Sequence, residues 1–396
     1  MVKMMLKGNE AIAYAMKVAR VKVVPAYPIT PSTLIPEKVS ELIANGEMDA
    51  EFVPVESEHS AISAAVGASA MGVRTATATA SQGLALMHEV LFIASGMRLP
   101  IVMGIGNRAL SAPINIWCDH QDMISQRDTG WIQFYAESNQ EAFDLMIIAF
   151  KVAENEKVLL PAMVGLDAFV LTHTMEAVDV PEQEKVDEFL GEFKPRYVVL
   201  DPSKPATLGA FAFPEHYMEF KYAQWIAMEQ AKGVIDEAFE EFKNRFGREY
   251  RKLYTYGIED ADTVIITMGS MSGTARAFVK EMRKKGEKLG HIKLTVFRPF
   301  PKEEFRKILE GKRNVIVVDR NISFGFGGAV YGELCATMYN CDDRPNIYDF
   351  IAGLGGRDVT LKDFEEMYRM VKDGKAEEIN WVNVDKEAVL KEEGLL

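Results

Sequence analysis

Residues 21–31 read Val-Lys-Val-Val-Pro-Ala-Tyr-Pro-Ile-Thr-Pro, a short apolar run that ends in two closely spaced prolines. The β-branched residues predict a strand that ends at Tyr27, where the next proline begins a turn. Apolar residues at helical spacing from Leu34 to Ile43 predict a helix after the turn. Thr30 can cap this helix and Pro31 suits its first turn. The stretch is therefore expected to be a strand that runs directly into a helix.

The same alternation continues along the chain and indicates the fold class. A helix made almost wholly of small residues is expected at 61–68. Strands that alternate with helices predict an α/β protein with a mostly parallel sheet and helices on both faces. Further strands are expected at residues 52–55, 74–80, 99–105, 158–165, 262–270, 294–301 and 314–319.

The pattern changes in the middle of the chain, which indicates a domain boundary. Residues 178–220 are rich in Pro, Asp and Glu and lack periodicity, so a long surface crossing is expected there. Residues 228–256 predict a charged amphipathic helix. We therefore divide the chain into residues 1–250, with the crossing segment from about 175, residues 251–360, and a charged tail at 361–396 that is expected to contact a partner.

Charge and composition exclude several classes of protein. The 396-residue chain has a net charge of −13, which argues against a nucleic-acid surface. It has no apolar stretch long enough to span a bilayer, and its first residues are not expected to be a signal peptide. The few cysteines, Cys118, Cys335 and Cys341, indicate a reducing compartment, so a cytoplasmic location is expected. Three thiols also cannot hold a four-thiolate iron–sulfur cluster.

Several polar and glycine-rich motifs are specific in combination. Together they resemble the α subunits of the multi-subunit 2-oxoacid:ferredoxin oxidoreductases, and most closely those of the pyruvate enzymes, or pyruvate synthases. The resemblance covers about residues 8–357. Its motifs are residues 27–31 (YPITP), 56–61 (ESEHSA), 79–84 (TASQGL), 107–109 (NRA), 119–122 (DHQD) and 353–357 (GLGGR).

The resemblance implies both a fold and a reaction. The fold is a pyrimidine-binding domain of the thiamine diphosphate enzymes, followed by a domain like the C-terminal domain of transketolase. The reaction is the reversible oxidative decarboxylation of pyruvate with coenzyme A, which yields acetyl-CoA and CO2 and reduces ferredoxin. The chain is expected to be active only together with its partner subunits.

The sequence lacks half of the machinery that this reaction needs. It has no Gly-Asp-Gly motif followed by an Asn, the pattern that holds the diphosphate and Mg2+ in thiamine enzymes, and no cysteine cluster. The resemblance therefore implies a β subunit that carries the diphosphate site, Mg2+ and a [4Fe-4S] cluster. It also implies γ and δ subunits with further clusters, and ferredoxin as the electron acceptor. Thiamine diphosphate would be shared between this chain and its partner.

Glu58 is the candidate catalytic residue. In thiamine enzymes a glutamate hydrogen-bonds N1′ of the aminopyrimidine and so helps the cofactor to lose its C2 proton. The resemblance assigns this role to Glu58, which also contacts the cofactor. Such a carboxyl group must be buried and able to carry a proton. The alternative is an acid favoured by the dipole at a helix N-terminus, which describes Glu56 well.

Thr30 and Arg108 are the candidate substrate-binding residues. Thr30 lies where a strand meets a helix N-terminus, a natural site for an anion such as the carboxylate of a 2-oxoacid. The fork of Arg108 can bind a carboxylate through two parallel hydrogen bonds. The family resemblance places both residues against the substrate. Without it, Thr30 is an N-cap and Arg108 a solvated surface residue.

The remaining cofactor-binding candidates are Pro28, Ile29, Ser81 and Gln82, which are expected beside the pyrimidine ring. The segment at 81–83 is equally well described as an ordinary turn between a strand and a helix.

No metal site is expected in this chain. His120 is expected to shape the substrate pocket or an interface, and Cys118 to be a buried small apolar residue. Residues 269–273 lack the full dinucleotide fingerprint and predict a tight strand-to-helix turn. The glycine-rich segments 324–328 and 353–357 lack a Walker lysine, so close backbone packing against another chain is expected, with phosphate binding as the minor alternative.

Three other functions stay open. The first is a branched-chain 2-oxoacid or indolepyruvate enzyme of the same family, although residues 119–122 favour pyruvate. The second is a non-catalytic assembly subunit. The third is a complete transketolase-type enzyme, which the missing diphosphate motif disfavours.

Overall fold

The computed structural model describes residues 2–196 and 199–395, which form two compact units. Unit 1 comprises the chain up to Tyr254 together with Leu294–Pro301, and unit 2 comprises Thr255–Lys293 and Lys302–Leu396. Both units alternate strands with helices around mainly parallel sheets, which confirms the predicted α/β class. No helix within the described ranges has the length and apolar character that crossing a membrane requires.

A five-stranded sheet forms the centre of unit 1. Its order is β12-β6-β7-β5-β4, and all neighbours are parallel except the β12–β6 pair. Four of these strands were predicted, two of them a few residues too early, whereas β6 was missed. The strands are β4 (Ala76–Thr79), β5 (Val102–Asn107), β6 (Ile132–Tyr135), β7 (Ala162–Asp167) and β12 (Val296–Arg298).

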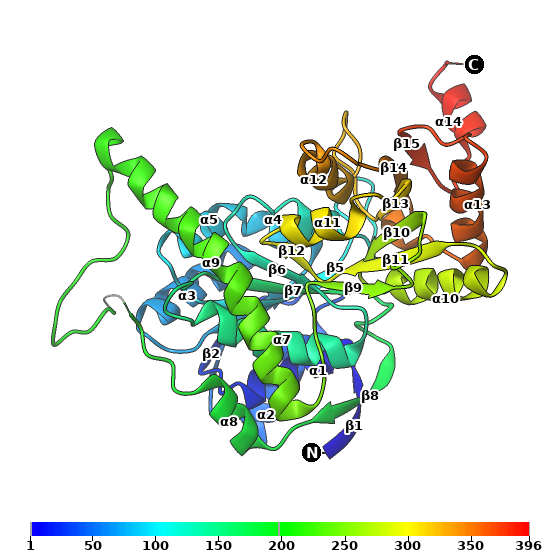
Figure 1. The fold of residues 1–396 in the computed structure, drawn as a ribbon. Coiled ribbons are helices and arrows are strands. Elements are labelled where there is room, and N and C mark those ends of the chain that lie inside the picture. Colours follow the sequence, from blue (N-terminus) through cyan, green and yellow to red (C-terminus); the bar gives the residue numbers. More distant parts are fainter. Residues whose placement is uncertain (1, 197–198, 396) are drawn as a thin grey trace. The chain divides into compact units, whose positions relative to one another are not determined.

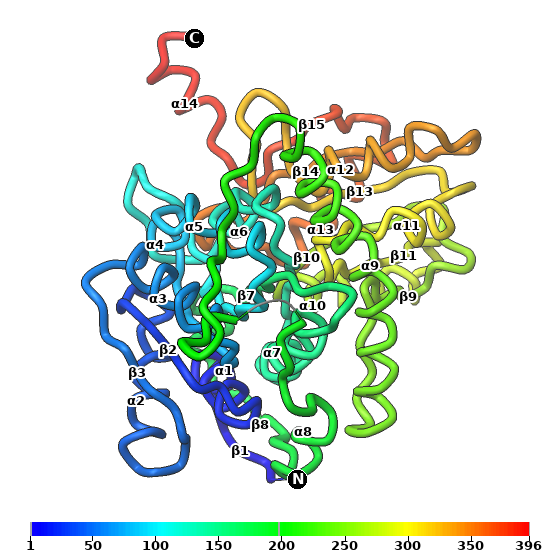
Figure 2. Tube along the Cα trace, turned by 90° about the vertical axis from the view of Figure 1, so that its left-hand side faces the viewer, coloured from blue at the N-terminus to red at the C-terminus, as the bar shows by residue number. Residues whose placement is uncertain are grey.

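Two small sheets complete the strands of unit 1. The predicted strands at the start of the chain form the parallel pair β2 (Val23–Ala26) and β3 (Glu51–Pro54), and Val23 bridges to Thr75 just before β4. The N-terminal strand β1 (Val2–Lys7) pairs antiparallel with β8 (Met175–Val180), and the two lie side by side in Figures 1 and 2.

Helices cover both faces of the central sheet, as predicted. Figure 1 shows α1 and α7 below the sheet and α4 and α5 above it. α7 is the central core helix, and Phe143, Ile147 and Phe150 on it are completely buried. The helices are α1 (Gly8–Val18), α2 (Leu34–Ala44), α3 (Glu58–Ala70), α4 (Ser81–Leu86), α5 (His88–Gly96), α6 (Gln121–Ile124) and α7 (Asn139–Ala153).

The helix α2, which follows β2, begins later than predicted. α2 starts at Leu34 with Thr33 before it, so Thr30 is not its N-cap and Pro31 is not in its first turn. Residues 30–33 instead form a turn that two side chains stabilise. Ser32 Oγ donates to the carbonyl of Ile29 at 3.0 Å, and Asn9 Nδ2 donates to that of Pro31 at 2.7 Å.

The middle of the chain is more regular than its composition suggests. The expected irregular crossing contains α8 (Gln183–Leu190), and the expected helix at 228–256 is α9, which spans Pro214–Phe246 and ends at Gly247 with φ +74°. β9 (Leu253–Tyr256) follows.

The first half of α9 lacked a periodic signal because its large apolar residues are exposed around the helix rather than along one face. The exposed residues at and before this half are Phe211, Phe213, Tyr217, Met218, Phe220, Tyr222, Trp225 and Ile226.

Unit 2 is built on a six-stranded sheet with the order β15-β14-β13-β10-β11-β9. The strands β10, β13, β14 and β15 are parallel neighbours. The strands that belong to this sheet besides β9 are β10 (Thr263–Met268), β11 (Leu289–Leu294), β13 (Asn314–Asp319), β14 (Asn346–Ile351) and β15 (Ile379–Trp381). The helices are α10 (Met271–Lys284), α11 (Lys302–Leu309), α12 (Ala329–Met338), α13 (Leu361–Lys372) and α14 (Lys386–Glu392), with a short 3-10 turn η1 (Leu354–Gly356).

Two sequence predictions need correction here. The strand expected at 294–301 in the second domain is β12, which follows β11 and pairs with β6 in unit 1. The expected charged tail begins with α13, whose Phe364 and Met367 are fully buried in the core of unit 2. The helix α14, later in the same segment, has no buried residue. The charged residues of α13 form its outer face, so composition alone concealed its buried side.

Candidate functional site

The candidate residues of unit 1 follow the carboxyl ends of parallel strands. Glu58 begins α3 after β3, Ser81 begins α4 after β4, and Arg108 directly follows β5. Because β4 and β5 are adjacent and parallel, their carboxyl ends lie at the same edge of the sheet. This edge is where open α/β sheets bind their ligands.

Glu58 lies in a buried position against a glycine. Its exposure is 7%, and a Cβ atom placed on Gly83 would be 2.6 Å from Glu58 Oε1 and 2.4 Å from Thr79 Oγ1. Within the described ranges, no residue donates a hydrogen bond to the Glu58 carboxylate. A buried carboxyl group without a donor is costly for a fold, so this position suits a group that receives its partner from a ligand.

Two further polar atoms beside Glu58 also lack hydrogen-bond partners. Thr79 Oγ1 and Gln82 Nε2 are buried and unpaired. The Thr79 hydroxyl can donate or accept a hydrogen bond, and the Gln82 amide nitrogen can donate one. Together with Glu58 they can bind a flat ring that carries both donors and acceptors. The aminopyrimidine of thiamine diphosphate is such a ring, and these residues fit it.

Glu56 lies just before the N-cap of α3, and Glu58 itself is the acidic residue in the first turn of this helix, so the helix-dipole role that was expected to suit Glu56 falls to Glu58. Glu56 is exposed and its Oε1 accepts a hydrogen bond from Ser60 Oγ at 2.5 Å. Ser57 is the N-cap of α3 and accepts from the backbone N–H of Ser60 at 3.2 Å. The two glutamates therefore differ sharply in surroundings, although they are only two residues apart.

Arg108 contacts the backbone of Thr30, and the binding of substrate by these two residues stays a prediction. Arg108 is 6% exposed; its Nη1 donates to the carbonyl of Thr30 at 2.9 Å and its Nε to that of Asn115 at 2.8 Å. A guanidinium group has five N–H donors, so these bonds leave donors for a carboxylate. Burial lowers the pKa of Arg108, and the charge of Asp122 opposes this shift. The Thr30 side chain is not used as a cap, since the residue is exposed in its turn.

Asp122 is a buried carboxylate that sequence reasoning did not assign to the site. Its Oδ2 accepts from the backbone N–H groups of Ser81 at 2.9 Å and Arg108 at 3.0 Å. Its Oδ1 accepts from Asn107 Nδ2 at 3.0 Å and from the N–H of Met123 at 2.7 Å. Burial raises the pKa of Asp122 to about 6, and the hydrogen bonds from Arg108, Asn107 and Ser81 oppose this shift. The only signal in the sequence was the motif at 119–122.

A second buried cluster joins Cys118, His120 and Asp167. Their potential ligand atoms all lie within 4.8 Å of one another, although the sequence predicted no metal site. His120 Nε2 and Asp167 Oδ1 are hydrogen-bonded at 2.9 Å, and the His120 ring packs against Tyr135. The Asp167–His120 bond orients the imidazole, which is consistent with the expectation that His120 shapes the pocket. Cys118 is completely buried, as expected.

Pro28 and Ile29 lie in a loop rather than at the start of a helix. Pro28 is exposed and Ile29 half-buried in the loop between β2 and α2. The carbonyl of Ile29 accepts the bond from Ser32 described above. Their contact with a cofactor therefore stays a prediction.

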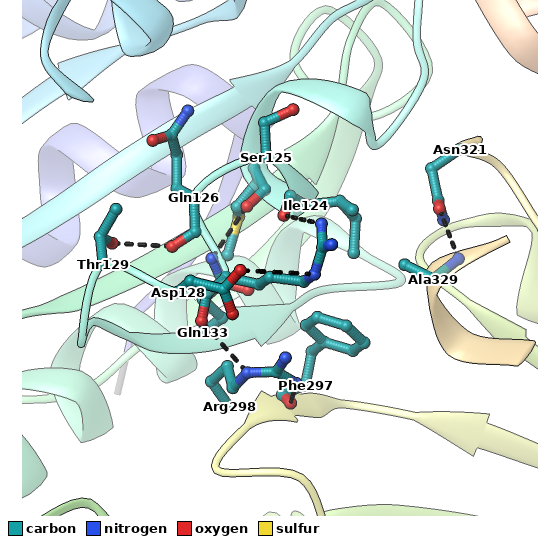
Figure 3. Close-up of polar contacts among 12 residues, drawn as sticks. Ile124, Ser125, Gln126, Asp128, Thr129, Gln133, Phe297, Arg298, Asn321 and Ala329 are labelled. Atoms are coloured by element: carbon teal, nitrogen blue, oxygen red, sulfur yellow. Dashed lines mark hydrogen bonds and ion pairs between the residues drawn. The ribbon is translucent and has the colours of Figure 1, made fainter. Parts of the chain in front are cut away.

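The glycine-rich segments of unit 2 are filled by side chains of the same unit. A Cβ atom on Gly328 would lie 2.0 Å from Asp319 Oδ2. Asp319 accepts from the N–H groups of Val330 at 3.2 Å and Tyr331 at 3.0 Å at the start of α12. Asn321 Oδ1 accepts from Ala329 at 2.9 Å (Figure 3). A carboxylate of the chain thus occupies the position that a phosphate takes at other helix N-termini.

The other two glycine motifs are explained by backbone conformation. Gly269 has φ +70° between β10 and α10, which is the tight turn that was predicted. Gly353, Gly355 and Gly356 have φ values of +75°, +60° and +82°, so residues 353–357 form a turn that needs glycine.

Comparisons with known proteins support a thiamine enzyme. A family model described as pyruvate flavodoxin/ferredoxin oxidoreductase, thiamine diphosphate-binding, matches residues 14–240. A second model, pyruvate:ferredoxin oxidoreductase core domain II, matches residues 261–364.

Individual relatives agree with these family models. Pyruvate synthase subunit PorA of Pyrococcus furiosus is 59% identical over 393 residues, which cover 98% of this chain and 99% of the relative. PorA of Methanocaldococcus jannaschii is 50% identical over 96% of this chain and 97% of its own length. Ketoisovalerate oxidoreductase subunit VorA of Pyrococcus horikoshii is 50% identical over 97% of this chain and 98% of its own length.

A solved structure supports the fold alone. It is that of 2-oxoglutarate:ferredoxin oxidoreductase from Magnetococcus marinus with 2-oxoglutarate, coenzyme A and succinyl-CoA bound. The match has a TM-score of 0.73 at 20% identity and covers 94% of this chain. This chain spans 65% of that longer chain.

Proposed function

This chain belongs to the pyruvate flavodoxin/ferredoxin oxidoreductase family, and from that premise we propose that it is the α subunit of a pyruvate:ferredoxin oxidoreductase. The assembled enzyme cleaves pyruvate with coenzyme A, releases CO2 and acetyl-CoA, and passes two electrons to ferredoxin. The reaction is reversible. The names of the relatives support pyruvate as the substrate, because PorA chains are up to 59% identical over nearly the full length.

The observation that carries the proposal is the buried carboxyl group of Glu58, which has no donor among the described residues. When bound, thiamine diphosphate supplies the acidic C2 carbon that attacks a 2-oxo group. Glu58 holds a proton at N1′ of the aminopyrimidine, and burial excludes the water that would otherwise compete for that bond. Thr79 and Gln82 orient the ring through their unpaired polar atoms.

Arg108 and Thr30 bind the substrate carboxylate. The guanidinium group is fixed by its bonds to the carbonyls of Thr30 and Asn115, so little side-chain freedom is lost when the anion binds. A fixed cation also favours an anionic substrate over a neutral ketone.

The other components belong to partner chains. This sequence has no diphosphate motif and three cysteines, so a β subunit brings the diphosphate site, Mg2+ and a [4Fe-4S] cluster. γ and δ subunits bring further clusters, coenzyme A is the co-substrate, and the complex works in the cytoplasm. Iron content and mass of the co-purified complex test this composition. Recovery of a chain that binds thiamine diphosphate tightly on its own would contradict it.

Glu58→Gln tests the catalytic assignment in the assembled complex. The amide cannot hold the proton, so pyruvate-dependent reduction of ferredoxin should fall about 10²- to 10⁴-fold, the usual range for loss of a proton-transferring group. Binding of thiamine diphosphate, measured by calorimetry, should be retained within about tenfold. Glu56→Gln is the matched control, since Glu56 is exposed and close in sequence, and it should keep normal turnover. Normal turnover of the Glu58 variant would exclude the proposal.

A branched-chain 2-oxoacid enzyme is the second candidate, because VorA chains are up to 50% identical to this one. The two substrates share the carboxylate and oxo groups and differ in their apolar part. A panel of pyruvate, 2-oxoisovalerate, 2-oxoglutarate and indolepyruvate decides between them. Pyruvate should have the highest kcat/KM.

A further inference from the structure

We infer that Asp122 is the positioning residue of this site, whose carboxylate fixes the cofactor-facing start of α4 and the substrate-facing end of β5 relative to each other. The inference rests on the proposed function and adds a residue to it. The carboxylate reaches three separate segments of unit 1, because Ser81, Arg108 and its own helix α6 all donate to it.

The first segment that Asp122 holds is the start of α4. Ser81 has φ +48°, a left-handed conformation that a residue with a side chain rarely adopts. Such a conformation persists only where the surroundings fix it. Two bonds do so here, since the Ser81 N–H donates to Asp122 and its Oγ donates to the carbonyl of Ala109.

The conformation of Ser81 also affects the surroundings of the Glu58 carboxyl group. Ser81 is followed by Gln82, which has an unpaired amide nitrogen, and by Gly83, which lies against Glu58 Oε1. A change in the conformation of Ser81 therefore moves the surface that Glu58 contacts.

The second segment is the end of β5. The same Oδ2 atom accepts from the backbone N–H of Arg108, and Oδ1 accepts from the side chain of Asn107. These bonds set the direction in which the chain leaves the strand, and hence where the Arg108 guanidinium begins. One carboxylate thus controls a residue on the cofactor side and a residue on the substrate side.

Asp122 is itself fixed by neighbours outside the site. Gln133 Nε2 on β6 donates to the carbonyl of Met123 at 2.9 Å, and the turn after α6 is closed by Thr129 Oγ1, which donates to Gln126 at 2.7 Å (Figure 3). Arg298 Nε on β12 donates to the carbonyl of Arg127 at 3.2 Å. α6 is therefore anchored to the sheet, as a positioning element must be.

Asp122→Asn tests the inference in the assembled complex. The substitution replaces one acceptor oxygen by an NH2 group, which is a donor. If this group takes the place of Oδ2, it faces the N–H groups of Ser81 and Arg108; if it takes the place of Oδ1, it faces the donors of Asn107 and Met123. Because both sides of the site shift, kcat should fall and the KM for pyruvate should rise, each about tenfold or more. Thiamine diphosphate affinity, measured by calorimetry, should also weaken.

Asp144→Asn is the matched control. Asp144 is also a completely buried carboxylate of unit 1 with several donors, but they are Arg248, Tyr250 and Gln140, none of which belongs to the site. This variant should lower the melting temperature and leave kcat and KM within about twofold of the wild type. If Asp122→Asn also changes only the melting temperature, the positioning role is refuted.

Two further variants keep the result interpretable. If Asp122→Asn does not assemble, Asn107→Ala removes a single bond to Oδ1 and should raise the KM for pyruvate by a few-fold. An unchanged KM in that variant counts against the inference. Glu58→Gln is measured in parallel: if it is also fully active, the proposed function fails, whereas an inactive Glu58 variant beside a kinetically normal Asp122 variant overturns this inference alone.

Discussion

Both units place a carboxylate beside a glycine close to a helix N-terminus, but they use this arrangement in opposite ways. In unit 2, Asp319 fits against Gly328 and accepts from the first N–H groups of α12, so the helix start is satisfied within the chain. In unit 1, Glu58 fits against Gly83, and no described residue donates to it.

The difference separates a structural motif from the candidate functional site. A glycine beside a carboxylate does not identify a ligand site, because the same close approach closes the loop of unit 2. The distinguishing feature is whether the carboxylate itself has donors: Asp319 accepts from the N–H groups of Val330 and Tyr331, whereas no described residue donates to Glu58. Around Glu58, Thr79 Oγ1 and Gln82 Nε2 also lack hydrogen-bond partners. In unit 2, burial and the charge of Asp319 raise the pKa of Asp349, which accepts from Gly328 at 2.6 Å.

Among the substitutions that test this comparison, Gly83→Ala should cause the largest loss of turnover. The new methyl group would overlap Glu58 Oε1 and Thr79 Oγ1, so the carboxyl group must move. Turnover of the assembled complex should fall about 100-fold, as expected for a displacement of about 1 Å at a reacting group. Gly67→Ala on α3 is the control, because no atom lies within 4 Å of its new methyl group. Equal activity of the two variants would mean that Glu58 tolerates displacement and is not catalytic.

Gly328→Ala should affect stability rather than turnover. Its methyl group would lie 2.0 Å from Asp319 Oδ2 and force this carboxylate away from α12. Overpacking of this kind costs about 1–3 kcal/mol, which should lower the melting temperature of the chain by several degrees. Gly273→Ala on α10 meets no neighbour and serves as the control. A loss of turnover at an unchanged melting temperature would indicate instead that this segment binds a ligand.

The smallest effect is expected for two N-cap serines with the same geometry. Ser57 before α3 and Ser138 before α7 each accept a backbone N–H at 3.2 Å. Replacing either by Ala should cost about 1 kcal/mol of stability. Only Ser57→Ala should also reduce turnover, by a few-fold, because the first turn of α3 carries Glu58. Thermal melting and ferredoxin reduction measured on both variants would show whether the two caps differ in this way.

The sequence was sufficient to predict features that depend on local composition. β-branched runs identified β2, β3 and β13, and the alternation of strands with helices identified the α/β class. β6 was missed although β2 and β3 are equally short, because the polar Gln133 interrupts its apolar run. The start of α9 was missed because its exposed aromatic residues give no apolar face.

Residues of the candidate site were assigned from the sequence only where a motif carried them, and their roles stay predictions. Glu58, Thr30 and Arg108 follow strand ends, and the resemblance named them. Asp122 was not recognised because its partners Ser81 and Arg108 are 41 and 14 residues away, and such pairings are set by the tertiary fold. For the same reason, the approach of Cys118, His120 and Asp167 to one another could not be predicted from local sequence.

The return of residues 294–301 to unit 1 has a consequence for the order in which the protein folds during synthesis. β12 supplies the edge strand beside β6, yet it leaves the ribosome after β10 and β11 of unit 2. Unit 1 therefore cannot complete its sheet until residue 298 has been made, and by then the chain of β10 and β11 has already been synthesised. A fragment that ends at Tyr254 would expose the edge of β6 to any strand that meets it. The two units thus have separate cores, but unit 1 needs a strand that is made only after part of unit 2.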